Sequence, residues 1–204
     1  MRAYVMELLG TFLLTFFIAF SGEPTVVGLV LMALVYLGIH ISGAHYNPAV
    51  TTAAFVRGKI DLQRGLTYVG MQFAGASAAF WVYNMVTGNM WGGDLMPSDA
   101  PAVAFGMEVL LTSILCLVIL TVGMGSRYRG GMVHGLVIGF TFVALVGIGG
   151  VMNPAIAAGA ILEGSLIGMP VLQDIPSLFS YIVAPLVAAV GSAYLYQYLN
   201  PDDR

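Results

Sequence analysis

Long apolar runs dominate this chain of 204 residues and limit the folds that are open to it. A helix needs about 20 apolar residues to cross the roughly 30 Å of hydrocarbon in a bilayer. Charged residues make up only 8% of the chain, whereas a typical soluble domain has about 25%, so water could not solvate the surface. The sequence therefore predicts an all-α integral membrane protein with six spanning helices. Their expected positions are about 4–20, 26–41, 66–87, 102–123, 133–148 and 179–199.

Two further apolar segments, at about 48–56 and 154–162, are too short to cross a bilayer as helices. Each is preceded by Asn and opens with Pro-Ala, so the chain holds the triplet twice. The copies are Asn47, Pro48 and Ala49, and Asn153, Pro154 and Ala155. Asparagine is favoured just before a helix, and proline suits the first helical position. The triplets therefore predict two helix starts, and the short lengths are typical of re-entrant half-helices.

The two halves of the chain resemble each other. The stretch ELLGTFLL at residues 7–14 matches EVLLTSIL at 108–115, and GLVLMALV from Gly28 matches GLVIGFTFV from Gly135. Three predicted spans separate equivalent points, so the second copy must have the opposite orientation in the membrane. We interpret the chain as one domain built from an inverted repeat, about 1–98 and 99–204. This architecture is found in membrane transport proteins.

The basic residues predict the orientation of the chain. If the N-terminus is cytoplasmic, every Lys and Arg falls at a terminus or in a cytoplasmic loop, in agreement with the positive-inside rule. These residues are Arg2, Arg57, Lys59, Arg64, Arg127, Arg129 and Arg204. Both termini are then cytoplasmic, and the two half-helices enter from opposite sides. Their N-terminal ends, each with roughly half a positive charge, would meet near the midplane beside the two Asn amides. Such a site suits neutral hydrogen-bonding molecules and repels cations.

Together these motifs resemble the aquaporin, or major intrinsic protein, family over nearly the whole chain. ELLGTFLL is similar to the family's first-helix signature and HISGAHYNPAVT to its first pore loop. Further residues of the family pattern are Gln72, Gly75, Glu108, Gly139 and Pro185. The resemblance implies an aquaporin-like channel with both Asn-Pro-Ala triplets at the pore midplane, and a homotetramer in the lipid bilayer. It also implies that the pore loops are supported by Glu7, Glu108, His40 and His45, with the two carboxylates accepting hydrogen bonds from loop N–H groups.

The position three residues after the second Asn departs from the family pattern. An Arg is usual there, at the outer constriction of the pore, whereas this chain has Ile156. By the same resemblance, the other constriction residues are Val27, Val146 and Gly150. The constriction is therefore expected to be apolar, uncharged and widened by the small Gly150. This pattern favours water and small neutral solutes, such as glycerol or ammonia, without sharp selectivity for water.

Other functional classes remain open on the sequence. A non-conducting or sensing member of the same fold is one, and the unusual Ile156 favours it. A secondary transporter is another, but it needs coupling-ion ligands or an alternating gate, and the spans hold two acids and no Lys or Arg. We expect no enzyme activity, because no nucleophile lies beside a base, and no metal, cofactor or nucleic acid as a partner. The compact loops favour a prokaryotic inner membrane.

Overall fold

The structure is a computed structural model, and it describes the chain except for residues 90, 92–99, 126–127, 129–132, 167–178 and 204, and the side chains of residues 164–166. The described part is helical. Its helices are α1 (Arg2–Ser21), α2 (Pro24–Gly38), α3 (Pro48–Val56), α4 (Leu62–Thr87), α5 (Pro101–Ile119), α6 (His134–Gly147), α7 (Pro154–Leu166) and α9 (Ala184–Leu199). A turn of π-helix extends α5 over Leu120–Met124, and another precedes α9 over Phe179–Val183.

The predicted fold class is confirmed, because each expected span contains one helix and each Asn-Pro-Ala triplet begins a short one. Within the described residues, three helical stretches are both long and apolar enough to cross a membrane: Arg2–Ser21, Pro101–Met124 and Phe179–Leu199. The helices Pro24–Gly38 and His134–Gly147 are apolar but shorter, and α4 has 26 residues. α7 continues to Leu166, beyond the end expected from the sequence.

Proline and glycine mark many of the helix ends. α2, α3, α5 and α7 all begin at a proline, whose fixed φ suits the first helical position. α4 begins after Asp61, whose carboxylate accepts a hydrogen bond from the Arg64 N–H at 2.9 Å. α1 and α4 stop at Gly22 and Gly88, which have φ values of 63° and 67°. Glycine adopts this left-handed conformation without a steric penalty, so it ends a helix readily.

Glycines also bring the helices into close contact. α1 packs along α4, where a Cβ on Gly75 would lie 2.4 Å from the carbonyl oxygen of Leu8. α2 packs along α6, where a Cβ on Gly28 would lie 2.7 Å from the carbonyl oxygen of Gly139. Small residues let spanning helices approach each other closely in this way. The crossing of Gly28 and Gly139 joins the first and second halves of the chain.

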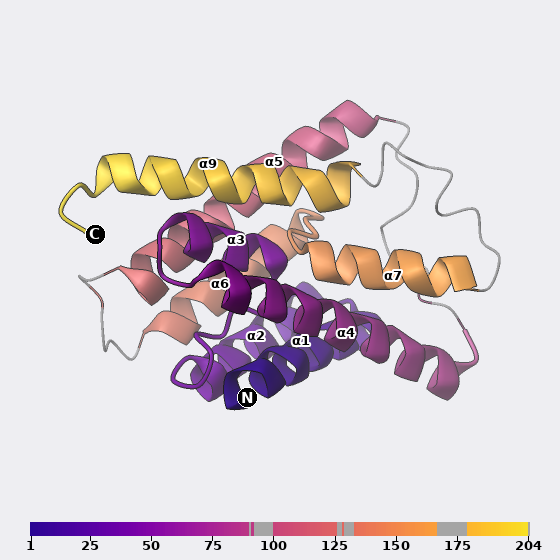
Figure 1. Cartoon of the computed structure of the whole chain (residues 1–204). Coiled ribbons are helices and arrows are strands. Elements are labelled where there is room, and N and C mark those ends of the chain that lie inside the picture. Colours follow the sequence, from indigo (N-terminus) through magenta and orange to yellow (C-terminus); the bar gives the residue numbers. More distant parts are fainter. Residues whose placement is uncertain (90, 92–99, 126–127, 129–132, 167–178, 204) are drawn as a thin grey trace.

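The short helices α3 and α7 lie in the middle of the bundle (Figure 1). In that view α5 and α9 lie above them, and α1 and α2 lie below. α3 packs against α9, and α7 packs against α4. Small residues such as Ala49, Ala53 and Ala54 of α3 are fully buried, so the half-helix fits between its longer neighbours.

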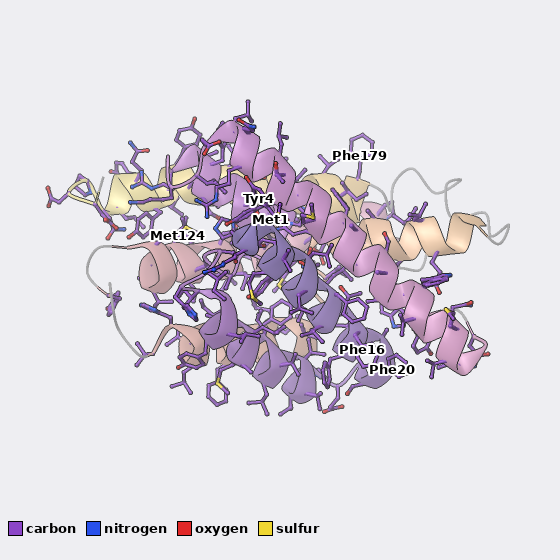
Figure 2. All side chains as sticks on the ribbon, turned by 60° about the horizontal axis from the view of Figure 1, so that its bottom comes forward. Met1, Tyr4, Phe16, Phe20, Met124 and Phe179 are labelled. Carbon is purple, nitrogen blue, oxygen red and sulfur yellow. The ribbon has the colours of Figure 1, made fainter. Side chains whose placement is uncertain are left out.

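Aromatic contacts join α1 and α4 at both ends of α1. Tyr4 lies at the start of α1 (Figure 2), and its ring meets that of Tyr68 edge-on with 6.0 Å between the ring centroids. Phe16 and Phe20 lie toward the other end of the helix (Figure 2), and the Phe20 ring centroid is 5.1 Å from that of Tyr83. Aromatic rings near both ends of a span are typical of the two membrane–water interfaces.

Candidate functional site at the meeting point of α3 and α7

Asn47 and Asn153 are the residues that precede α3 and α7. Oδ1 of Asn47 accepts a hydrogen bond from the Ala49 N–H at 2.8 Å, and Oδ1 of Asn153 accepts one from the Ala155 N–H at 3.1 Å. Each side-chain oxygen thereby satisfies one of the N–H groups that have no partner at the start of a helix. The same bond fixes the direction of each amide, because Nδ2 must then face away from its own helix.

A reciprocal pair of hydrogen bonds joins the two half-helices. Nδ2 of Asn47 donates to the carbonyl oxygen of Met152 at 2.7 Å, and Nδ2 of Asn153 donates to that of Tyr46 at 3.0 Å. Each asparagine therefore binds the carbonyl that precedes the other asparagine. An amide carries two N–H groups, so each side chain has a further donor besides the one used in this pair.

Tyr46 and Met152 adopt a backbone conformation that is uncommon for residues with a side chain. Their φ values are 50° and 53°, in the left-handed region. This conformation lets the carbonyl of each residue face the opposite asparagine while its N–H faces a carboxylate. The Tyr46 N–H donates to Oε2 of Glu7 at 2.7 Å, and the Met152 N–H donates to Oε2 of Glu108 at 2.7 Å.

Glu7 lies inside α1 and holds the first loop through both of its carboxylate oxygens. Oε1 accepts hydrogen bonds from the Ser42 hydroxyl at 2.5 Å and from the His45 N–H at 3.0 Å. Oε2 accepts from the Tyr46 N–H and from Nε2 of Gln72 at 2.8 Å. A buried carboxylate is stable only when it is well hydrogen-bonded, and these four donors provide that environment.

Glu108 lies inside α5 and holds the second loop with fewer bonds. Within the described part of the chain, Oε1 accepts from the Val151 N–H at 2.6 Å and Oε2 from the Met152 N–H. The two predicted loop-supporting acids thus make the same kind of contact, each with a pair of adjacent loop N–H groups. The first loop has two additional side-chain donors, from Ser42 and Gln72.

The two predicted loop-supporting histidines differ in their surroundings. His45 is buried, and its Nδ1 lies 3.1 Å from Oγ1 of Thr51. Thr51 in turn donates to the carbonyl oxygen of Asn47 at 3.0 Å, so His45 belongs to the network around the first triplet. His40 is exposed in the turn after α2, and no hydrogen bond joins it to the described residues. The support of the loop by His40 therefore stays a prediction.

A partly open cavity, which we call the asparagine cavity, lies beside the meeting point. Its volume is about 30 Å³, which holds on the order of two water molecules at roughly 10–15 Å³ each. Polar groups enter it from both asparagines and from the loop before Asn47, and the opposite wall is apolar. The apolar residues include Leu14, Leu31, Val35, Leu115, Ile138 and Phe142.

A second and larger space, which we call the apolar cavity, contains all four residues predicted to form the outer constriction. Its volume is about 190 Å³. It is lined by Ile18, Gly22, Val27, Trp91, Phe142, Val146, Gly149, Gly150, Val151 and Ile156. No described lining residue carries a charge, so Ile156 leaves this wall without the positive group that an Arg would provide.

Gly150 lines the apolar cavity through its backbone, but its missing side chain does not widen that cavity. A Cβ on Gly150 would lie 2.7 Å from Cδ1 of Leu111 and 3.3 Å from the carbonyl oxygen of Leu145. The absent side chain therefore faces packed protein. The expectation that the small Gly150 widens the constriction is corrected, because glycine at this position permits close packing of the loop against α5 and α6.

Phe142 lines two cavities, and the sequence analysis did not predict this. It is buried, with 2% of its surface exposed, and it lines both the asparagine cavity and the apolar cavity. Phe142 precedes Val146 by one turn of α6, so both side chains lie on the same face of the helix. That i, i+4 spacing is the signal that could have identified it.

Comparison with known proteins agrees with this geometry. The sequence model described as major intrinsic protein matches residues 1–196. The glycerol uptake facilitator protein-like 6 of Lactiplantibacillus plantarum is 30% identical over an alignment of 223 residues, which covers 100% of both chains. The probable aquaporin AqpM of Archaeoglobus fulgidus is 34% identical over 183 residues, covering 84% of this chain and 73% of that protein. The X-ray structure of the aquaglyceroporin from Plasmodium falciparum has the same fold, with a TM-score of 0.79 and 23% identity over 96% of this chain and 94% of that one.

Proposed function

Because the chain belongs to the major intrinsic protein family, we propose that it forms a passive transmembrane channel for water and small neutral solutes. The observation that carries this proposal is the reciprocal bonding of Asn47 and Asn153 at the wall of the asparagine cavity. Two fixed donors that face one narrow space offer a passing molecule the same hydrogen bonds at every passage. No group has to change its position or its protonation state, as coupled transport would require.

The electrostatics of the midplane favour neutral solutes. The N-terminal ends of α3 and α7 point to the same place, and each carries roughly half a positive charge from its helix dipole. The amide groups of Asn47 and Asn153 add N–H donors there. A solute oxygen is well placed to accept these donors, whereas a cation meets positive potential from both helices. We therefore assign the exclusion of cations to this midplane.

The apolar cavity supports weak discrimination among small neutral molecules. An uncharged wall with Val27, Val146 and Ile156 offers few hydrogen bonds to a passing solute. Its volume of about 190 Å³ is also several times the volume of the asparagine cavity, about 30 Å³. We assign the outer constriction to these residues, with the backbone of Gly150 opposite. Glycerol and ammonia both fit such a passage.

We place the narrowest part of the proposed path at Phe142. The residue lines both the asparagine cavity of about 30 Å³ and the apolar cavity of about 190 Å³, so it is the side chain at which the two spaces approach each other. The sequence placed the α6 constriction residue at Val146, and the two cavities support a position one turn earlier in the same helix. Val146 then belongs to the wider entrance.

A permeability panel on reconstituted protein tests the proposed function. Water, glycerol, ammonia and proton fluxes are measured on the same vesicles and compared with those of empty vesicles. Linear dependence of flux on gradient, with no saturation at millimolar solute, is the expected result for a passive channel. Fluxes equal to those of empty vesicles would instead support a non-conducting or sensing protein, and saturable uptake that depends on an ion gradient would support a secondary transporter.

The substitution Ile156→Arg tests the assignment of the outer constriction. A guanidinium at this position would add donors and a positive charge to the apolar cavity, whose described lining residues carry no charge. We expect the ratio of glycerol to water permeability to fall on the order of tenfold, because a size difference of one or two methylene groups in a pocket changes discrimination between solutes by about that factor. Ile156→Leu, which conserves volume, is the control and should leave the ratio unchanged. If Ile156→Arg alters neither water nor glycerol flux in a folded protein, the assignment is wrong.

We further propose a homotetramer with one pore per subunit and with both termini in the cytoplasm, by the family relationship and the positive-inside rule. Two contacts support a common side for the basic segments. Arg57 donates to the carbonyl oxygen of Asp203 near the C-terminus. The Arg64 side chain lies on the ring of Tyr68, and that ring contacts Tyr4 near the N-terminus.

Light scattering of the protein in mild detergent should give a tetrameric mass. A C-terminal reporter that is active only in the cytoplasm should be active.

A further inference from the structure

The side chain of Tyr46 leaves the pore loop and lies in a slot between α1 and α2. It is fully buried, and the walls of the slot include Gly10 of α1 and Gly38 of α2. A Cβ on Gly10 would lie 2.0 Å from Cε1 of the Tyr46 ring, and a Cβ on Gly38 would lie 1.8 Å from the hydroxyl oxygen. Both distances are far inside van der Waals contact. The slot therefore accepts a tyrosine only because both of these positions are glycine.

The hydroxyl group of Tyr46 is tied to α2 by a hydrogen bond. It donates to the carbonyl oxygen of Leu34 at 3.0 Å in a buried environment. Water does not reach this place to replace the bond, so losing it would leave a buried polar group without its partner. A phenylalanine would fill most of the same slot, but nothing would hold its ring at a fixed position along α2.

The backbone of Tyr46 carries two of the bonds on which the midplane depends. Its N–H donates to Glu7, and its carbonyl accepts from Nδ2 of Asn153. With a φ of 50°, the residue has a conformation that its Cβ disfavours. A small relaxation toward negative φ would turn the carbonyl away from Asn153, so the geometry has to be held from outside the loop.

The second loop lacks an equivalent side-chain anchor. Met152 has the same backbone role, with a φ of 53° and bonds to Glu108 and Asn47. Its buried thioether offers no hydrogen-bond donor. Of the two residues, only Tyr46 has a side chain that is tied to a spanning helix by a hydrogen bond, through its hydroxyl group. That bond can hold the backbone carbonyl of Tyr46 in place.

We propose that Tyr46 is a positioning residue of the pore, whose phenol, held by Leu34, Gly10 and Gly38, fixes the carbonyl to which Asn153 donates. The Tyr46 carbonyl determines which N–H of Asn153 is engaged and which one remains for the solute. When the phenol is not held, the Tyr46 carbonyl can turn away from Asn153, and Nδ2 of Asn153 loses the acceptor that leaves its other N–H for a passing water. This inference rests on the proposed channel function.

The decisive variant is Tyr46→Phe, which removes the hydroxyl and keeps the ring. Water permeability is measured by light scattering, and proton permeability by a pH-sensitive dye inside the same proteoliposomes. One buried hydrogen bond changes a conformational population by up to about tenfold, so we expect the ratio of proton to water permeability to rise by several-fold up to that limit. Tyr194→Phe is the matched control, because Tyr194 of α9 is 63% exposed, and it should leave the ratio unchanged.

A second pair of variants separates positioning from packing. Gly38→Ala places a methyl group where the hydroxyl lies and should lower the unfolding temperature as well as raise the permeability ratio. In the double variant, Gly38→Ala with Tyr46→Phe, the hydroxyl is gone, and the ring atom nearest to the new Cβ of residue 38 is Cζ at 3.0 Å. The double variant should therefore recover much of the unfolding temperature. It should not recover the low ratio of proton to water permeability. Restoration of both quantities would show a packing role only and would overturn the inference.

The possible failures can be told apart. If the wild-type protein conducts water and Tyr46→Phe leaves the ratio of proton to water permeability unchanged, the inference about Tyr46 is wrong and the channel function stands. If the wild-type protein does not conduct above empty vesicles, the proposed function fails, and the role of Tyr46 in conduction fails with it.

Discussion

Replacing Glu7 by glutamine is expected to destabilise the protein more than the matched change Glu108→Gln. Each oxygen of the Glu7 carboxylate accepts two hydrogen bonds. Glutamine keeps one oxygen and presents an NH₂ group to one loop N–H and one polar side chain. The loop N–H loses its acceptor, and the Ser42 hydroxyl or the Gln72 amide must turn to accept from the NH₂ group. At Glu108 the same change affects one donor. Since a buried donor without a partner costs about 1–3 kcal/mol, we expect a loss of that size at Glu108 and a larger loss at Glu7, where a second hydrogen bond is also rearranged.

The comparison of the two variants is made by thermal unfolding in the same detergent, because both substitutions remove one buried charge from a spanning helix. The wild-type protein and an exposed substitution such as Glu23→Gln provide the reference; Glu23 lies before α2 at the surface. If Glu108→Gln lowers the unfolding temperature as much as Glu7→Gln, the additional bonds to Ser42 and Gln72 do not stabilise the first loop. The different numbers of hydrogen bonds at the two loops would then make no difference to the free energy of unfolding.

Replacing Phe142 by alanine is expected to raise glycerol permeability on the order of tenfold, with a smaller rise for water. Phe142 lines both the asparagine cavity of about 30 Å³ and the apolar cavity of about 190 Å³, so we expect removal of its ring to widen the passage between them. A barrier that is steric falls most for the larger solute, and differences of this size in a pocket change rates by about 10- to 200-fold. The measurement is glycerol and water flux in proteoliposomes that contain equal amounts of protein.

The control for this variant lies on the same helix. Phe140 of α6 is 58% exposed and faces away from the cavities, so Phe140→Ala removes an identical side chain without changing the path. Its fluxes should equal those of the wild type. If Phe142→Ala remains folded and its glycerol flux is unchanged, the narrowest point of the path lies elsewhere.

The sequence predicted the bundle and the midplane because their signals are local. Apolar length defines a span, and Asn-Pro-Ala defines a helix start, so Asn47 and Asn153 could be placed without any knowledge of packing. The carboxylates of Glu7 and Glu108 were expected to accept loop N–H groups, and the structure shows such bonds for both.

Other features depended on packing that no local pattern encodes. The register of α6 could not be read from the sequence because the turn before Asn153 is short and folds tightly, with the N–H of Gly149 and Gly150 bonded back to Val146 and Leu145. The i, i+4 spacing could therefore name Phe142 as an alternative to Val146, but it could not decide between the two. The slot of Tyr46 is formed by Gly10 and Gly38, which are distant in sequence from each other, and their shared role is visible only when α1 and α2 are packed.

The unequal support of the two loops has a consequence for the order of events during biosynthesis. Glu7, Ser42, Tyr46 and Gln72 all lie in the part of the chain that is made first, so their bonds can form while the second half is still on the ribosome. The reciprocal asparagine bonds join residues 105 and 107 positions apart, so they can form only after the second half has been made. The first half can therefore hold its loop open in the nascent protein, as a template on which the later loop docks.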